Sequence, residues 1–178
     1  VVPVRNEEGN VAILVGEIDS ALKHILHEII YVDDGSTDNT FQEIHALSNE
    51  DRRVKFIELS RNFGHQNAIK AGLDHAEAPV AIMMDCDLQH PPELIPLMPK
   101  EYEKGYEIVR THRKEANHEG YLKKKTSALF YRALNSFSEV SLEKGSADFR
   151  LVSGKALEQL RGFNELDIFF RGLIKWMG

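Results

Sequence analysis

Short apolar runs alternate along this chain with longer stretches in which apolar residues recur at helical spacing. The runs predict strands at residues 1–4, 28–32, 54–59, 80–84, 106–110 and 149–152. Helical spacing predicts helices at residues 11–23, 65–76, 121–137 and 155–160, with a further helix after the second strand. Such alternation indicates βαβ units, and therefore an α/β fold with a mostly parallel, Rossmann-like sheet flanked by helices.

The helix after the second strand has a recognisable start signal. Ser36 or Thr37 is expected to cap it, because hydroxyl side chains accept hydrogen bonds from the first free N–H groups of a helix. Asp38 would then lie in the first turn, where a carboxylate interacts favourably with the helix dipole. We therefore assign Asp38 a structural role.

Polar loops follow four of the predicted strands. They span residues 5–10, 33–38, 60–66 and 85–93. In open α/β sheets, ligands bind outside the carboxyl ends of the strands. We therefore expect these four loops to converge on one binding site.

The clearest chemical signal is Asp85-Cys86-Asp87, directly after the apolar run at residues 80–84. Residues i and i+2 of a strand point to the same side, and two carboxylates there repel each other unless a cation lies near them. Oxygen ligands suit Mg²⁺ or Mn²⁺, and Gln89 would add a neutral oxygen. The alternative is a solvated loop with capping aspartates. The position after a buried strand favours the metal.

Two other aspartates admit two interpretations each. Asp34 ends a strand, where a carboxylate either accepts hydrogen bonds from a nucleobase or ribose or stabilises the turn at Gly35. Asp148 is either a general base facing the cleft or the partner of Arg150 in a salt bridge, and residue chemistry alone favours the salt bridge. Cys86 has no base partner in the pattern and is expected to be a small buried residue rather than a nucleophile.

Composition excludes several classes of protein. The 178 residues suit one domain, and the net charge of −6 gives little support for nucleic-acid binding. The single cysteine excludes an intrachain disulfide and a multi-cysteine zinc site. No run of about 18 apolar residues, no P-loop and no dinucleotide fingerprint occurs.

Several basic residues lie late in the chain: Arg110, Arg113, Lys114, Lys123, Lys124, Lys125 and Arg171. An arginine among them could neutralise a diphosphate. The Lys123–Lys125 run is either a solvated helix face, which is the default interpretation, or a surface for anionic lipid headgroups.

Five motifs together resemble a known family. VPVRNEEGN, YVDDGSTDNT, LSRNFGHQNAIKAGLDHA, MDCDLQHPPE and SADFRLVS occur in the order seen in family-two, GT-A-type glycosyltransferases. The likeness covers nearly the whole chain and is strongest to the polyprenyl-phosphate branch, meaning dolichol-phosphate mannosyltransferases and bactoprenol-phosphate glucosyltransferases. It implies a GT-A (nucleotide-diphospho-sugar transferase) fold. It also implies one catalytic domain over residues 1–178, trimmed from a longer protein with membrane helices beyond residue 178.

The resemblance implies an inverting reaction. A UDP- or GDP-sugar would donate its sugar to a polyprenyl (undecaprenyl or dolichyl) phosphate, and Mg²⁺ or Mn²⁺ would stabilise the leaving diphosphate. The parent protein would act at the cytoplasmic face of a membrane, in cell-wall, surface-polysaccharide or lipid modification. It implies no nucleic-acid partner and leaves a homo-oligomer open. Two alternatives remain: transfer to a saccharide or protein acceptor, and a catalytically silent module that binds nucleotide sugars.

Each of the five motifs also implies roles for particular residues of this chain. Asp87 and Gln89 would bind the metal, and Asp148 would act as the base or orient the acceptor, which raises its functional interpretation above the salt bridge. The nucleotide-sugar site would comprise Pro3, Arg5, Glu7, Val32, Asp34, Asp85, Cys86, Arg113 and Arg171. Two departures stand out. Position 5 is Arg where many relatives carry Tyr, and residues 165–168 lack the additional arginines of relatives, so diphosphate binding depends more on Arg171 and the metal.

Overall fold

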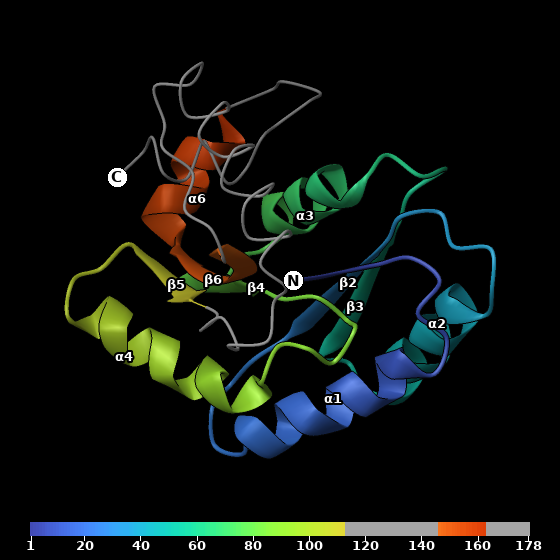
Figure 1. Cartoon of the computed structure of the whole chain (residues 1–178), viewed down its shortest axis with the longest axis horizontal. Helices are drawn as coiled ribbons and strands as arrows, with labels where there is room; N and C mark the ends of the chain where they lie inside the picture. The colour runs from blue at the N-terminus through green and yellow to red at the C-terminus, as the bar shows by residue number, and fades with distance from the viewer. Residues whose placement is uncertain (113–145, 163–178) are drawn as a thin grey trace, which may run out of the picture.

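The computed structural model describes residues 1–112 and 146–162 (Figure 1). The strands are β1 (Val2–Val4), β2 (Ile29–Asp33), β3 (Val54–Glu58), β4 (Val80–Met83), β5 (Ile108–His112) and β6 (Ser146–Ser153). The helices are α1 (Asn10–Ala21), α2 (Thr40–Glu50), α3 (His65–Asp74), the 3₁₀ helix η1 (Pro92–Leu97), α4 (Met98–Glu103) and α6 (Gly154–Arg161). The predicted helix at residues 121–137 lies outside the described residues.

The strands form two three-stranded sheets that meet at the start of β1. In the first sheet, β2 pairs in parallel with both β1 and β3. In the second sheet, β6 is antiparallel to both β4 and β5, so β4 and β5 run in the same direction. The Val1 nitrogen donates to the Ile82 oxygen at 2.7 Å, and the Met84 N–H donates to the Val1 oxygen at 3.2 Å. These two bonds have the pattern of a parallel pair and join β1 to β4.

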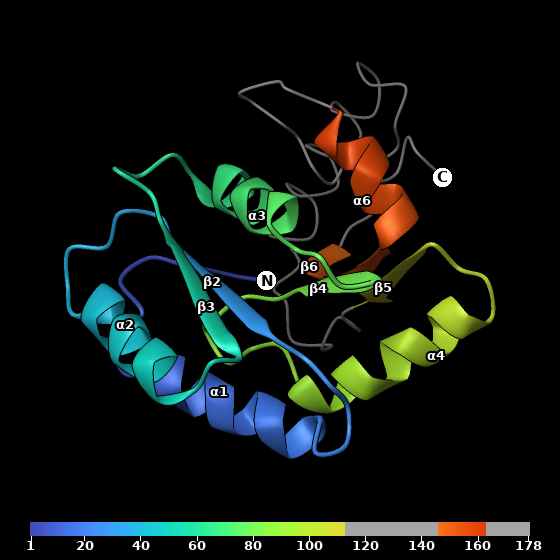
Figure 2. The same ribbon diagram turned by 180° about the vertical axis from the view of Figure 1, so that it is seen from behind.

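Helices cover both faces of the sheets, as Figures 1 and 2 show. α1, α2 and α4 lie on one side, and α3 and α6 lie on the other. Successive residues of β2 divide between the two faces: Ile29 and Tyr31 pack in the core cluster with α1, whereas Ile30 and Val32 pack with α3 and α6. A strand that alternates between two cores has no polar face, which explains its continuous apolar run. The expected α/β fold is confirmed, with β6 as the reversed strand.

The predicted start of the second helix is wrong. α2 begins at Thr40 after Asn39, and neither Ser36 nor Thr37 caps it. The Ser36 hydroxyl donates to Asp33, and the Thr37 N–H donates to the side chain of Asn6, so these residues join loops. Asp38 precedes the helix instead of lying in its first turn. Its carboxylate accepts the Thr40 N–H at 3.1 Å, which is a structural role as expected.

η1 and α4, over residues 92–103, were not predicted. Three prolines in this stretch hid the helical spacing, and Pro91-Pro92 looked like a rigid loop exit. Pro92 and Pro99 lie in the first turns of η1 and α4, where a missing N–H costs no intrahelical hydrogen bond. Buried Ile95 and Met98 pack this segment against the core cluster that includes α1.

Candidate active site at the carboxyl ends of the strands

A cavity of about 510 Å³ opens where β1, β2 and β4 end and α3 begins. It brings together seven of the residues that the sequence predicted for the site: Pro3, Arg5, Glu7, Asp34, Asp85, Cys86 and Asp87. Five further residues of the lining had no assigned role in the site: Val4, Asn62, Gly64, His65 and Ala68. The signal for Asn62, Gly64 and His65 was the polar loop after the third predicted strand, which was expected to reach the site without any of its residues being singled out.

Loop 5–10 is fastened to the segment between β2 and α2. The Asn6 N–H donates to the Ser36 hydroxyl at 3.0 Å, and the Glu7 N–H donates to the Thr40 hydroxyl at 2.8 Å. Asn6 adopts a φ of 56°, a left-handed conformation that asparagine tolerates. These bonds hold the backbone of Arg5 and Glu7 at the cavity edge without using their charged groups as anchors.

Asp34 fastens a third loop to the same place. Its two carboxylate oxygens accept the backbone N–H groups of Phe63 at 2.6 Å and Gly64 at 2.9 Å, and its own N–H donates to the Val4 oxygen. The structural role considered for Asp34 is therefore present, and its contact with a base or ribose stays a prediction. Val32 is fully buried among core residues beside α3 and does not line the cavity, so its nucleotide contact also stays a prediction.

Gly35 allows two of these loops to approach closely. Its φ is +70°, and a Cβ built there would lie 2.7 Å from the backbone of both Arg61 and Asn62. Gly35→Ala is expected to lower the free energy of unfolding by about 2–4 kcal/mol, the sum of left-handed strain and a clash with backbone that cannot move aside. Urea denaturation measures this change.

Gly9 is the matched control for Gly35. Its φ is +85°, but a Cβ there would meet nothing within 4 Å. Gly9→Ala should therefore cost only the strain of the left-handed conformation, about 1 kcal/mol. Equal losses at the two positions would contradict the close approach of the loops.

The Asp85-Cys86-Asp87 segment turns sharply after β4. Asp87 is exposed, and its Oδ1 accepts the Gln89 N–H at 3.0 Å across Leu88, whose φ is +59°. Such a turn holds the carboxylate at the mouth of the cavity. Cys86 is 2% exposed and packs in the core, and burial raises the pKa of its thiol to about 12. A thiol held protonated in this way fits the expected small buried residue.

Asp87 and Gln89 suit a hard cation that has few protein ligands. Both offer oxygen atoms on an exposed turn, the donor type that Mg²⁺ and Mn²⁺ prefer. Within residues 1–112 and 146–162, no group of three or more His, Cys, Asp or Glu side chains is arranged to hold a metal. A cation at this turn would therefore need oxygens from a ligand to complete its coordination.

Asp148 lies at the edge of this site. Its Oδ1 accepts a hydrogen bond from the Arg150 guanidinium at 2.8 Å, and both side chains are buried. Its Oδ2 faces the Nε2 of His65 at 3.7 Å. The salt bridge considered from the sequence is therefore present beside the cavity, and the role as base or acceptor-orienting group stays a prediction. Arg113 and Arg171 lie outside the described residues.

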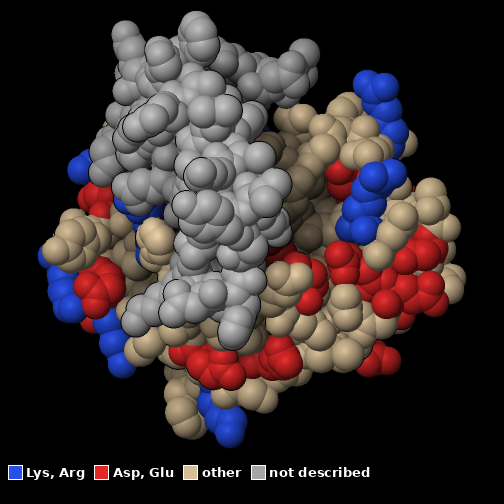
Figure 3. Space-filling view, viewed as in Figure 1, with Lys and Arg blue, Asp and Glu red and all other residues tan. Residues whose placement is uncertain are grey.

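Burial and charge crowding affect Asp85. Burial raises the pKa of this carboxyl above its usual value, and nearby His90 and His65 oppose the rise. Asp148 and Asp87 raise the pKa further because like charges favour the neutral form. Figure 3 shows further acidic side chains gathered on the side of α1 and α2. The carboxylates of Asp85 and Asp87 lie in the same cavity lining as Arg5.

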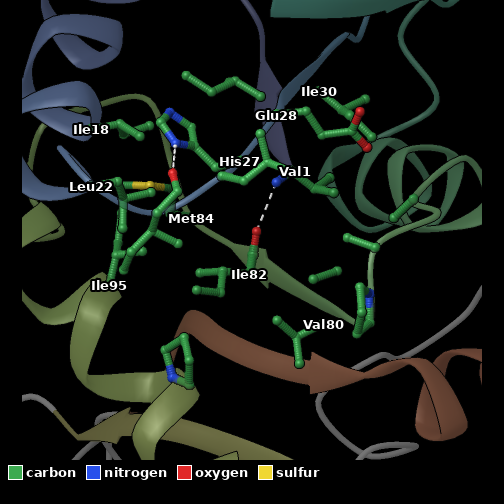
Figure 4. Close-up of a pocket in the computed structure, with 18 of the residues that line it drawn as sticks. Val1, Ile18, Leu22, His27, Glu28, Ile30, Val80, Ile82, Met84 and Ile95 are labelled. Atoms are coloured by element: carbon green, nitrogen blue, oxygen red, sulfur yellow. Dashed lines mark hydrogen bonds between the residues drawn. The ribbon is translucent and has the colours of Figure 1, made fainter. Parts of the chain in front are cut away.

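A second hollow, of about 360 Å³, differs in chemistry. It lies between α1, the starts of β2 and β4, and η1, and Figure 4 shows Ile18, Leu22, Ile82, Met84 and Ile95 around it. Its lining is mostly apolar, although it contains His27, Glu28 and Glu103, and it includes none of the predicted site residues. The chemistry of the site therefore belongs to the cavity at the other ends of the strands.

The sequence model of Glycosyl transferase family 2 matches residues 1–161. The chain is 39% identical over 184 residues to the glycosyltransferase YkcC of Bacillus subtilis and 36% identical over 180 residues to the bactoprenol glucosyl transferase of Shigella phage SfV. Both alignments cover 100% of this chain but only 56% and 59% of those proteins. The chain thus spans a little over half the length of these relatives. None of the helices in the described ranges is long and apolar enough to cross a membrane.

Two solved structures share the fold. The mannosyltransferase PcManGT of Pyrobaculum calidifontis, in complex with GDP-Man and Mn²⁺, aligns with a TM-score of 0.63 and 16% identity over 96% of this chain and 48% of its own. Glucosyl-3-phosphoglycerate synthase of Mycobacterium tuberculosis, with Mn²⁺ and UDP, aligns with a TM-score of 0.58 and 18% identity over 85% of this chain and 55% of its own.

Proposed function

We propose, from the premise that this chain belongs to glycosyl transferase family 2 and has the GT-A fold, that it is the catalytic domain of a polyprenyl-phosphate glycosyltransferase. The domain would transfer a sugar from a UDP- or GDP-sugar to a polyprenyl phosphate, with inversion at the anomeric carbon. The observation that carries this proposal is the cavity in which four separate strand-end motifs meet. Relatives named bactoprenol glucosyl transferase support the acceptor.

The donor would occupy the 510 Å³ cavity. Arg5 and Glu7 lie on one fastened loop and Asp34 on the next, so the backbone that carries these residues and the carboxylate of Asp34 are held before the nucleotide binds. Preorganised groups of this kind lose little entropy on binding. Asp85 and Cys86 would lie along the nucleotide, and Arg113 and Arg171 would add positive charge at the diphosphate.

A divalent cation would be held by Asp87 and Gln89. When bound, Mg²⁺ or Mn²⁺ supplies positive charge to the leaving diphosphate. Asp87 and an ionised Asp85 carry negative charge in the cavity lining, so the donor diphosphate would meet repulsion from them without such a cation. This repulsion is the physical reason to expect metal dependence.

Asp148 would act on the acceptor. A lipid phosphate is already ionised near neutral pH, so Asp148 either orients the acceptor or takes a remaining proton. Arg150 donates to Oδ1 of Asp148 and offsets the cost of burying its charge, while Oδ2 faces the cavity residue His65. The parent protein would work at the cytoplasmic face of a membrane, where such lipids present their phosphate.

Transfer assays with the intact protein test the function. We expect a labelled sugar to move from one UDP- or GDP-sugar to undecaprenyl phosphate in the presence of Mn²⁺, and the same donor to raise the melting temperature by binding the native state. Transfer to saccharides or peptides but not to lipid phosphate would contradict the acceptor. Donor binding without turnover on any acceptor would instead establish a silent binding module.

A further inference from the structure

One imidazole lies between two carboxylates that come from different strands. The Nε2 of His65 is 3.4 Å from Oδ1 of Asp85 and 3.7 Å from Oδ2 of Asp148. We propose that His65 is a positioning residue, which holds Asp148 on the acceptor side at a set distance from Asp85 on the donor side. This inference rests on the proposed function, because it assigns His65 a task within that reaction.

The sheet register brings the two carboxylates together. β4 and β6 are antiparallel, with Ile82 opposite Leu151 and Met83 opposite Arg150. Asp85 follows Met83 by two residues and Asp148 precedes Arg150 by two, so both carboxylates lie near this end of the strand pair. Like charges held near each other repel, so a donor group between them stabilises their approach. His65 comes from a third element, the first turn of α3, and its Nε2 faces both.

Two other groups contact one carboxylate of the pair each. Arg150 donates to Oδ1 of Asp148, the oxygen that does not face His65. His90 approaches Asp85 from the opposite side: its Nδ1 accepts the Asp85 N–H at 3.0 Å, and its Nε2 lies 3.6 Å from Oδ2. A neutral His90 with Nδ1 as acceptor carries its proton on Nε2, toward that carboxylate.

The ring of His90 packs against β6, the strand that carries Asp148. Its ring stacks on Phe149 at 5.1 Å between ring centroids with an interplanar angle of 14°. Phe149 is 1% exposed and precedes Arg150 on β6, so this packing fixes the ring of His90 and the backbone of β6. It does not fix the carboxylate of Asp148, whose Oδ2 faces His65. The Nε2 of His65 faces an oxygen of each carboxylate and so joins the donor-side group to the acceptor-side group.

Loss of this contact should affect turnover more than donor binding. A misplacement of about 1 Å at a reacting group can cost about 10²-fold in rate. His65→Ala is therefore expected to lower kcat by about 10–100-fold, with KM for the nucleotide sugar changed by less than about threefold. Donor affinity persists because the proposed nucleotide contacts at Arg5, Glu7 and Asp34 remain. His65→Gln should recover part of kcat, since its amide nitrogen can reach the place of Nε2.

His75→Ala is the matched control, because His75 lies at the other end of α3, is exposed, and contacts the Ala71 oxygen through its ring. Kinetics and melting temperatures of all three variants are compared in the intact protein. Unchanged kcat in His65→Ala overturns the proposal. A lowered melting temperature in His65→Ala, together with an equally inactive and equally destabilised His65→Gln, overturns it in favour of a structural role.

These outcomes differ from a failure of the proposed function. Wild-type turnover with a saccharide acceptor instead of a lipid phosphate would refute the acceptor, and the ratio of kcat values would still decide the role of His65. An absence of wild-type turnover with any acceptor would refute the function, and with it any role of His65 in that reaction.

Discussion

Asp87→Ala is expected to lower sugar transfer by about 10³-fold, the largest effect of any single substitution in the site. Asp87 is the exposed carboxylate on the turn after β4, and its partner Gln89 offers only a neutral oxygen. Without Asp87, the proposed cation would lose its charged protein ligand, and the leaving diphosphate would lose the charge that stabilises it. The measurement is the initial rate of transfer across a titration of Mg²⁺ or Mn²⁺.

Asp74→Ala serves as the control for Asp87→Ala. Asp74 ends α3 and pairs with Lys70 on the surface, so its removal should change the rate by less than about twofold. Both variants should melt within about 2 °C of the wild type, because exposed side chains contribute little to stability. Undiminished transfer by the wild type in excess chelator would refute the metal role.

Asp148→Asn is expected to lower kcat by about 10²–10³-fold, with little change in KM for the donor. The amide keeps the shape of the side chain and can still accept the Arg150 hydrogen bond, but it cannot take a proton or carry a charge toward the acceptor. Steady-state kinetics measure the effect, with the donor varied at saturating lipid phosphate for its KM and with lipid phosphate varied at saturating donor for kcat. A variant that retains more than half of the wild-type kcat would refute a direct role.

Asparagine is the informative substitution because Arg150 is buried. Its side chain is 3% exposed and that of Asp148 is 8% exposed, so removal of the carboxylate leaves a guanidinium without its partner oxygen. Asp148→Ala should therefore lower the free energy of unfolding by about 3–5 kcal/mol in addition to its effect on rate. A comparison of the two variants by urea denaturation and kinetics separates chemistry from folding.

The periodicity of apolar residues correctly predicted several elements and many of their buried side chains, because both depend on the local order of residues. The alternation of β2 between two cores and the buried face of α3 both followed from local pattern. Prediction failed where residues bonded to a distant loop instead of capping the helix that follows them. Ser36 and Thr37 have the chemistry of helix caps, yet the Ser36 hydroxyl accepts the Asn6 N–H and the Thr37 N–H donates to the Asn6 side chain. The local sequence does not distinguish a residue that caps the next helix from one that bonds to a distant loop.

Some residues of the candidate site could be located from the sequence, and others could not. The sequence pattern located Asp85, Asp87 and Asp34 at the ends of strands, and the cavity confirms that these residues meet. The pattern could not identify His65, because a histidine at the start of a helix has no distinctive spacing. Its importance depends on two carboxylates that lie 20 and 83 residues further along the chain.

The amino-acid sequence by itself determined the α/β class, the family and the four polar loops that meet at the cavity. These features depend on the order of apolar and polar residues, which can be read directly from the sequence. Tertiary structure decided which groups face one another: the reversed direction of β6, the register that brings Asp85 and Asp148 to one end of a strand pair, and the place of His65 between them. Periodicity reports which side chains are buried, but hydrogen-bond pairing between distant strands sets direction and register.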